Sequence, residues 1–427
     1  MDPSGEGGGL RGPPEGYGWG VKGWGARRAG RPLRHARPAG QVRNHSWAVS
    51  AAALTLIGTM VVVLVTALNS SGRPLLAVAS PGGASTAGAA PRLSLPIASV
   101  EPEAAASTTP SAVPSPGAST ATVRASRFGA GLLIADRGNG RLLFVDDKGK
   151  VLWRFPVRGS LAPGQRFAAD DAFISPDGKT IVANEEEHEV IVRIDIATRK
   201  VIWQYGHFDR AGSGRGQLHT PDDAYPLANG DIIVADIENC RILQIAPDKH
   251  VVHQWGRTGV CVDRAPWTYG RPNGDTPLPD GGILITEIKD SRVVRLSASG
   301  RVVFDFHVPV RYPSDAQLMR NGNVLVADYS SPGQVVIMSP TGHLVWRYAP
   351  TSGVRRLDHP SLAVELADGT IALNDDFRHR IVVIDPRTDR IVWQYGHTDR
   401  RGTTAGYLYV PDGIDPIPMG TALGGSG

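Results

Sequence analysis

Two stretches of the sequence carry the same unusual set of side chains. Residues 201–210 read VIWQYGHFDR, and residues 390–400 read RIVWQYGHTDR. Each ends in a histidine, an aspartate and an arginine, which are residue types that transfer protons or bind anions. These residues are His207, Asp209 and Arg210 in the first stretch, and His397, Asp399 and Arg400 in the second. The pattern is either a pair of half-sites that meet at one ligand or one piece of architecture used twice.

A second set of polar residues follows a recurring proline. It consists of Asp222, Asn273, Ser314, Ser361 and Asp412, with Asp170 at the same place in a segment that lacks the proline. Asp171, Asp223 and Asp315 stand beside them. Oxygen ligands of this kind suit Ca²⁺ or another divalent metal. The alternatives are a cationic ligand, or ordered water with structural hydrogen bonds.

Several connecting segments are rich in arginine and aromatic residues, with Arg355 and Arg356 as further candidates for ligand binding. Guanidinium groups and aromatic faces suit anionic or sugar-like ligands, and they are also frequent at protein interfaces. Solvated loop charge is the alternative. His219 and His359, close before two of the recurring prolines, are the histidines that we would test as acid–base groups.

These residues must be positioned by a repeated β-structure, because the sequence repeats itself from residue 128 onward. Five consecutive segments begin with a Gly-containing turn and end in an aromatic strand such as VIWQYG, VVHQWG, VVFDFH, LVWRYA or IVWQYG. Short β-rich runs separated by DG and NG turns are typical of antiparallel meanders, and four strands make one propeller blade.

The first unit lacks an innermost strand, and residues 410–420 supply one. We therefore predict an all-β, six-bladed propeller closed by its N- and C-terminal strands. The recurring proline begins the innermost strand of each blade, so the polar set should ring one mouth of the central channel.

Two family resemblances accompany this repeat. Residues 212–256, GSGRGQLHTPDDAYPLANGDIIVADIENCRILQIAPDKHVVHQWG, resemble an NHL repeat. RIDIATRKVIWQYG, VIDPRTDRIVWQYG and VDDKGKVLWRF resemble the last two strands of PQQ-like, quinoprotein-type repeats. Both resemblances imply a propeller, and both families include interaction domains as well as enzymes. Quinoprotein dehydrogenases have eight blades and a vicinal cysteine pair. This sequence has neither feature, so the resemblance does not imply that it binds their quinone cofactor.

A further repeated position is expected to be structural. Acids or amides end the second strand of each blade: Asp136, Asn184, Asp236, Glu287, Asp328 and Asn374. Short polar side chains bond to turn amides, and a neighbouring arginine can pair with them.

The two cysteines, Cys240 and Cys261, lie in a turn and the following loop. They are expected to form a disulfide outside the cell.

The segments before the propeller point to a membrane anchor. Residues 1–46 form a basic tail with eight Lys/Arg against three acids, so the formal net charge of +4 leaves about −1 for the rest. This distribution gives no support for nucleic-acid binding. Residues 47–68, WAVSAAALTLIGTMVVVLVTAL, carry no charge and would span roughly 33 Å as a helix, enough for a bilayer core of about 30 Å. A cleaved signal peptide is the alternative.

The domain organisation that follows is a cytoplasmic tail (1–46), a signal anchor (47–68), a disordered Ala/Ser/Thr/Pro-rich stalk (69–126), the propeller (127–420) and a flexible end (421–427). The expected function is extracytoplasmic binding or sensing of a protein, glycan or small molecule on the loop-rich face. A metal-dependent hydrolase or lyase at the channel mouth is the alternative, and a quinone-dependent oxidoreductase is the least favoured.

Overall fold

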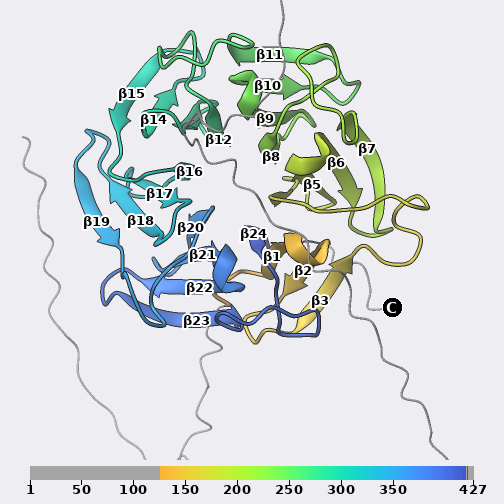
Figure 1. Ribbon diagram of the computed structural model, residues 1–427, viewed down its shortest axis with the longest axis vertical. Helices are drawn as coiled ribbons and strands as arrows, with labels where there is room; N and C mark the ends of the chain where they lie inside the picture. Colours follow the sequence, from red (N-terminus) through yellow and green to blue (C-terminus); the bar gives the residue numbers. More distant parts are fainter. Residues whose placement is uncertain (1–125, 420, 422–427) are drawn as a thin grey trace, which may run out of the picture. The chain divides into compact units, whose positions relative to one another are not determined.

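The computed structural model describes residues 126–419 and 421. Within them, 24 strands form six four-stranded antiparallel sheets arranged around a common axis (Figure 1). The predicted six-bladed propeller is confirmed. No helix in this described part of the chain is long and apolar enough to cross a membrane. The predicted anchor at 47–68 lies outside the described residues, as do the tail, almost all of the stalk and most of the C-terminal end.

The composite blade contains strands from both ends of the propeller. It consists of β24 (Pro411–Ile417), β1 (Gly131–Asp136), β2 (Arg141–Val145) and β3 (Val151–Phe155), in that order. β24 and β1 pair antiparallel, with Leu133 opposite Asp415. This pairing closes the ring as predicted, because it joins the last strand of the propeller to the first.

The other five blades are continuous in sequence. The second blade contains β4 (Ala172–Ile174), β5 (Thr180–Glu185), β6 (Val190–Asp195) and β7 (Lys200–Gly206). The third contains β8 (Pro221–Pro226), β9 (Ile232–Asp236), β10 (Arg241–Ile245) and β11 (Val251–Gly256). The fourth contains β12 (Pro272–Pro277), β13 (Ile283–Glu287), β14 (Arg292–Leu296) and β15 (Val302–His307). The fifth contains β16 (Pro313–Leu318), β17 (Val324–Asp328), β18 (Gln334–Met338) and β19 (Leu344–Tyr348). The sixth contains β20 (Ala363–Glu365), β21 (Ile371–Asp375), β22 (Arg380–Asp385) and β23 (Arg390–Gly396).

Four short 3₁₀ helices follow second strands: η1 (Arg137–Asn139), η2 (Glu186–His188), η3 (Ile237–Asn239) and η4 (Asp376–Arg378). Because the strands alternate in direction, these turns and the loops that join one blade to the next emerge on the same side of the ring. We call this side the loop face.

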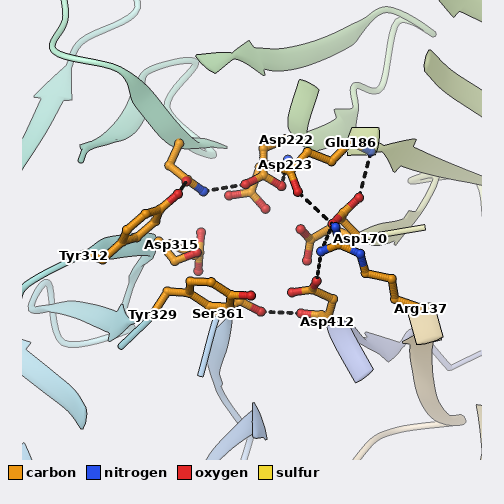
Figure 2. Close-up of a pocket in the computed structure, with 13 residues that line it drawn as sticks. Arg137, Asp170, Glu186, Asp222, Asp223, Tyr312, Asp315, Tyr329, Ser361 and Asp412 are labelled. Carbon is orange, nitrogen blue, oxygen red and sulfur yellow. Dashed lines mark hydrogen bonds and ion pairs between the residues drawn. The ribbon is translucent and has the colours of Figure 1, made fainter. Parts of the chain in front are cut away.

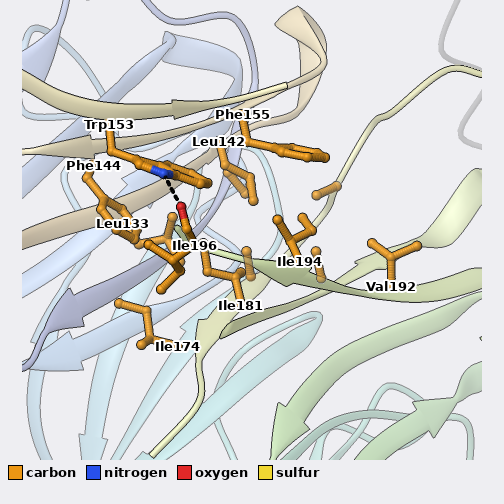
Figure 3. Packing of buried hydrophobic residues seen from close by; sticks show 14 of the residues in the cluster. Leu133, Leu142, Phe144, Trp153, Phe155, Ile174, Ile181, Val192, Ile194 and Ile196 are labelled. Atoms are coloured by element: carbon orange, nitrogen blue, oxygen red, sulfur yellow. Dashed lines mark hydrogen bonds between the residues drawn. The ribbon is translucent and has the colours of Figure 1, made fainter. Parts of the chain in front are cut away.

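Apolar side chains pack between neighbouring blades. Between the composite and second blades, Trp153 stacks on Phe144 with ring centroids 4.7 Å apart, and its Nε1 donates to the carbonyl of Ile196 at 2.9 Å (Figure 3). Trp203, Trp346 and Trp393 occupy the same place and donate to Pro247 O, Asp389 Oδ1 and Asp147 O. Four of the six blade interfaces therefore share one tryptophan hydrogen bond. In the third and fourth blades, His253 and Phe304 stand at that position.

The strand register shows that two of the residues predicted to end second strands, Asn184 and Asn374, were misaligned. Asp136 pairs with Arg141 and Asp236 with Arg241, but the matching acids in the second and sixth blades are Glu185 and Asp375. Asn184 and Asn374 lie one residue earlier, and a shift of one residue moves a strand side chain to the other face of the sheet. Asn184 Nδ2 accordingly donates to Asp222 Oδ1 of the next blade, at 3.2 Å.

The correctly aligned acids hold the loops in place. Asp136 accepts hydrogen bonds from Tyr409 N and Arg141 Nε, Asp236 from His219 N and Arg241 Nε, and Asp375 from Asp358 N and Arg380 Nε. The predicted structural role of this position is therefore supported. Cys240 and Cys261 form the expected disulfide, with Cα atoms 5.2 Å apart.

Candidate functional site

The polar set that follows the recurring proline gathers at one small cavity on the loop face, as predicted. All six residues line it: Asp170, Asp222, Asn273, Ser314, Ser361 and Asp412 (Figure 2). The cavity measures about 50 Å³. A volume of this size holds a few water molecules or an ion, whereas small-molecule sites usually measure about 300–1,000 Å³.

An arginine that the sequence did not point to reaches into this ring. Arg137, the first residue of η1, is only 9% exposed, and its guanidinium pairs with Asp170 and Asp412. It also pairs with Glu186, at 3.1 Å, and with Glu187. One buried cation thus connects the last strand of the propeller with the second blade.

The cavity nevertheless has more carboxyl groups than its arginine can balance. Burial raises the pKa of Asp315 to about 7, and burial with the nearby Glu186 does the same for Asp222. Burial and neighbouring carboxylates raise the pKa values of Asp171 and Asp223 well above the usual range. These surroundings strongly favour protonation or binding of a cation.

Fixed hydrogen bonds order the other side of the ring. Tyr312 Oη donates to Asn273 Oδ1 at 2.8 Å, and Asn273 Nδ2 donates to Asp222 Oδ2 at 2.5 Å. The Ser361 hydroxyl donates to the carbonyl of Asp412. The ring members are therefore held in place by neighbouring blades rather than left free in solvent.

The two candidate acid–base histidines lie outside the cavity. His359 Nδ1 lies 2.7 Å from Asp358 Oδ1, and its ring packs against Tyr329 and Phe377. His219 uses its backbone amide to bond Asp236. Neither is among the thirteen described residues that line the cavity.

The repeated His-x-Asp-Arg stretches form two matching loops on the loop face. Asp209 lies 2.7 Å from His188 Nδ1 and accepts a hydrogen bond from Arg166 Nη2 at 3.2 Å. Asp399 accepts from Nε and Nη2 of Arg378, at 2.9 and 2.8 Å. His188 and Arg378 end η2 and η4, so each aspartate fastens its loop to the turn of its own blade.

The following blade fastens the same loops from the other side. Asn239 Nδ2 donates to Gly212 O and Arg241 Nη1 to Ser213 O, at 2.9 and 3.3 Å. In the second copy, Asn139 Nδ2 donates to Gly402 O and Arg141 Nη1 to Thr403 O, at 2.9 and 2.6 Å. The two stretches are one architecture used twice.

The other members of the repeated stretches lie at the surface. The side chains of His207, Arg210, His397 and Arg400 are exposed. The His397 ring lies 4.1 Å from the ring of Tyr407, between centroids. The backbone amides of Arg210 and Arg400 donate to the carbonyls of His207 and His397, both at 2.9 Å, so each arginine occupies the same position in its turn.

Arg356 and Asp399 meet at a shallow groove between the fifth and sixth blades. The groove, of about 780 Å³, is also lined by Arg378 and residues 351–354. Arg356 Nη2 donates to Ser331 Oγ at 2.9 Å and pairs with Asp358. Arg355 is exposed, and its Nη1 contacts Asp389 O at 3.4 Å. The candidate ligand-binding residues therefore lie on one face, but the structure divides them between this groove and the two loops.

Arg137, Glu186 and Tyr329 are cavity residues that the sequence analysis missed. They share one signal: each directly follows the acid that ends a second strand, at the start of the turn on the loop face. The acids before Arg137 and Tyr329 were recognised, whereas Glu185 was not, and the residue after the acid was recognised in none of the three blades.

Comparison with known proteins supports the repeat type. Residues 248–409 match the model of a PQQ-like repeat family described as outer membrane protein assembly factor BamB. This match covers less than half of the chain, and it supports the predicted resemblance to PQQ-like repeats. The resemblance to NHL repeats gains no support from this match. No curated protein matches the sequence.

Solved structures match this chain at low identity and with TM-scores below 0.5. A protein of unknown function from Bacteroides caccae is 17% identical with a TM-score of 0.49, covering 67% of this chain and 98% of the other. A streptogramin B lyase is 14% identical with a TM-score of 0.39, covering 54% and 70%. A nidogen/laminin complex is 12% identical with a TM-score of 0.47, covering 66% and 97%. No activity is carried over from these similarities.

Proposed function

We propose that this chain is a membrane-anchored, extracytoplasmic binding module whose loop face binds an anionic group on a protein, glycan or small molecule. The observation that carries the proposal is the matched pair of loops that present Arg210 and Arg400. Each loop is fastened by its own blade through Asp209 or Asp399 and by the next blade through an Asn and an Arg.

Rigid loops favour binding because less conformational entropy is lost when a ligand is bound. Arginine suits carboxylate, phosphate and sulfate groups, since its planar fork can donate two parallel hydrogen bonds. Arg355 and the groove beside Arg356 extend the same face with further guanidinium groups. The expected ligand therefore carries negative charge and is wide enough to touch more than one blade.

The proposed location rests on the sequence before the propeller and on the disulfide. Residues 47–68 have the length and composition of a membrane span, and the basic residues before it favour a cytoplasmic N-terminus. The Cys240–Cys261 bond suits an oxidising compartment.

Binding is preferred to catalysis at the channel mouth because the cavity there is small. A cavity of about 50 Å³ admits an ion or water but not the reacting part of a substrate. The alternative of a metal-dependent hydrolase or lyase would require the ring around Arg137 to open.

The first test is a binding survey with defined probes. Full-length protein in detergent would be immobilised and exposed to sulfated, phosphorylated and carboxylated oligosaccharides and peptides, each beside its neutral counterpart. We expect saturable binding of at least one anionic probe, weakened by salt. Equal binding of charged and neutral members of every pair would count against the proposal.

A further inference from the structure

We propose that Asp171, Asp222 and Asp223 bind one Ca²⁺ ion beside the channel-mouth cavity, and that this ion joins the second and third blades. Asp171 directly precedes β4, and the other two residues lie in β8, so the three carboxylates come from adjacent innermost strands. The site is separate from the proposed binding loops, and it concerns the packing of the ring.

The geometry fits a single ion. One carboxylate oxygen from each of the three residues lies within 4.8 Å of the others. Ca²⁺ binds oxygen at about 2.3–2.6 Å, so ligands on opposite sides of the ion lie roughly 5 Å apart. One Ca²⁺ can therefore reach all three carboxylates, and the cavity that they line has room for water molecules to complete its shell.

Two of the buried carboxylates each have one oxygen without a hydrogen-bond donor. Asp171 is 5% exposed and Asp223 is 2% exposed. Asp171 Oδ1 and Asp223 Oδ2 accept no hydrogen bond from any residue that the structure describes. A buried carboxylate oxygen that lacks a partner is strongly unfavourable, and a bound cation would satisfy both oxygens at once.

The third carboxylate is oriented by its neighbours. Asp222 Oδ1 accepts hydrogen bonds from Asn184 Nδ2 at 3.2 Å and from the Asp223 amide at 3.0 Å. Such contacts fix the direction of a metal ligand while leaving lone pairs for the ion.

Neighbouring blades keep the space beside the unpartnered oxygens clear of side chains. A Cβ atom on Gly413 would lie 2.6 Å from Asp171 Oδ1, and one on Gly274 would lie 3.2 Å from Asp223 Oδ2. Both glycines stand two residues after the recurring proline, the position that Asp223 itself occupies in β8. Glycine at these two places therefore accommodates the buried carboxylates.

Asp315 provides a matched control from the same ring. It occupies the equivalent position in the fifth blade and is also 2% exposed. Its Oδ1 accepts from Thr276 Oγ1 at 3.2 Å and its Oδ2 from Gln317 Nε2 at 3.0 Å. Asp315 is thus an equally buried carboxylate that already has donors.

The test is Ca²⁺ binding by the full-length protein, purified in detergent, treated with EDTA and desalted. Equilibrium dialysis with ⁴⁵CaCl₂ should show one saturable site per chain. Asp171→Asn/Asp223→Asn should weaken it at least tenfold, and Asp315→Asn, which removes a nearby charge but no ligand, should weaken it much less. Absence of saturable binding up to about 10 mM Ca²⁺, beyond the range of weak natural sites, would overturn the proposal. An equal loss in both variants would overturn it as well.

Melting temperatures supply a second readout, and its wild-type part does not depend on the variants folding. Ca²⁺ should raise the melting temperature of the wild-type protein, and the double variant should lose this response. Without Ca²⁺ the double variant should melt no lower than wild type, because two buried like charges have been removed. A purely structural role predicts a lower melting temperature, and a wild-type protein that does not respond to Ca²⁺ would refute the site.

Discussion

The guanidinium of Arg137 donates a hydrogen bond to the carboxylate of Asp412, which lies 275 residues later in the sequence. Arg137 follows β1 and Asp412 lies in β24, the first and last strands of the ring. The same guanidinium pairs with Asp170 at the entrance to the second blade. Closure of the propeller therefore rests on a buried ion pair as well as on the β1–β24 hydrogen bonds.

Replacing Arg137 should strongly destabilise the protein. Arg137→Met leaves Asp170 and Asp412 buried without their cation, and the loss of one partner from a buried pair typically costs about 3–5 kcal/mol. The free energy of unfolding from urea titration would measure this. Arg387→Met, which removes a partner of Asp385 at the surface, should change it little. Equal effects of the two substitutions would show that the Arg137 pairs do not stabilise the ring.

The tryptophan hydrogen bonds between blades should differ in importance according to their burial. Trp153→Phe leaves the carbonyl of Ile196 without its donor at a buried contact, and we expect a loss of about 1–3 kcal/mol. Trp393→Phe frees the carbonyl of Asp147 at the surface, where water can replace the donor, so a loss of about 1 kcal/mol or less is expected. Denaturant midpoints of the two variants would give the comparison. A larger loss for Trp393→Phe would contradict it.

Glu185 should make stability depend on pH. It is 1% exposed, and burial raises its pKa to about 7. The folded state therefore binds its proton more tightly than the unfolded state, whose carboxyl keeps its ordinary pKa near 4.5. The stabilisation is complete below about pH 4.5 and is lost as the pH rises through 7, by up to about 3 kcal/mol.

The corresponding measurement is the difference in unfolding free energy between wild type and Glu185→Gln from pH 5 to 8. Wild type should lose stability relative to the variant over this range. Asp280→Asn is the control, since the Gly282 amide and Arg295 lower the pKa of Asp280 and place its titration below the window. A difference that stays flat for Glu185→Gln would argue against a proton held at this carboxyl.

The disulfide should stabilise the propeller measurably. It joins residues 21 apart in sequence, and closure of such a loop in the unfolded chain corresponds to about 3 kcal/mol in the chain-entropy model. Cys240→Ala/Cys261→Ala should lower the unfolding free energy by about that amount under oxidising conditions. Wild type and variant should converge when dithiothreitol is added. An unchanged gap in reductant would assign the effect to side-chain packing instead.

The sequence was sufficient for the parts of the structure that repeat. Turn residues and strand alternation recur in every blade, and the proline recurs in all but the second, so the six blades, the composite blade and the ring at the channel mouth could be predicted. Pairings between distant segments could not, because nothing near Arg137 in the sequence indicates Asp412. The position of Asn184 and Asn374 was misaligned because two polar residues are adjacent there and only the strand register decides which one faces the next blade.

The same limit applies to the repeated His-x-Asp-Arg stretches. Their types and spacing fit acid–base chemistry, yet Asp209 and Asp399 fasten loops to His188 and Arg378. These partners belong to the preceding turn of the same blade, and the sequence does not indicate that turn and loop meet. Arg210 and Arg400 remain exposed on these loops, and the proposed anion binding rests on them.

Equilibrium binding of the strongest anionic probe from the survey tests the proposed binding face most directly. Arg210→Ala/Arg400→Ala would be compared with Lys200→Ala/Arg390→Ala, which removes the same charge from the opposite ends of β7 and β23, the strands that lead into the two loops. Arginine anchors at interfaces often contribute more than 1 kcal/mol each, so the first variant should bind at least about tenfold more weakly, while the second should bind like wild type. Equal affinities of the two variants would contradict binding on the loop face.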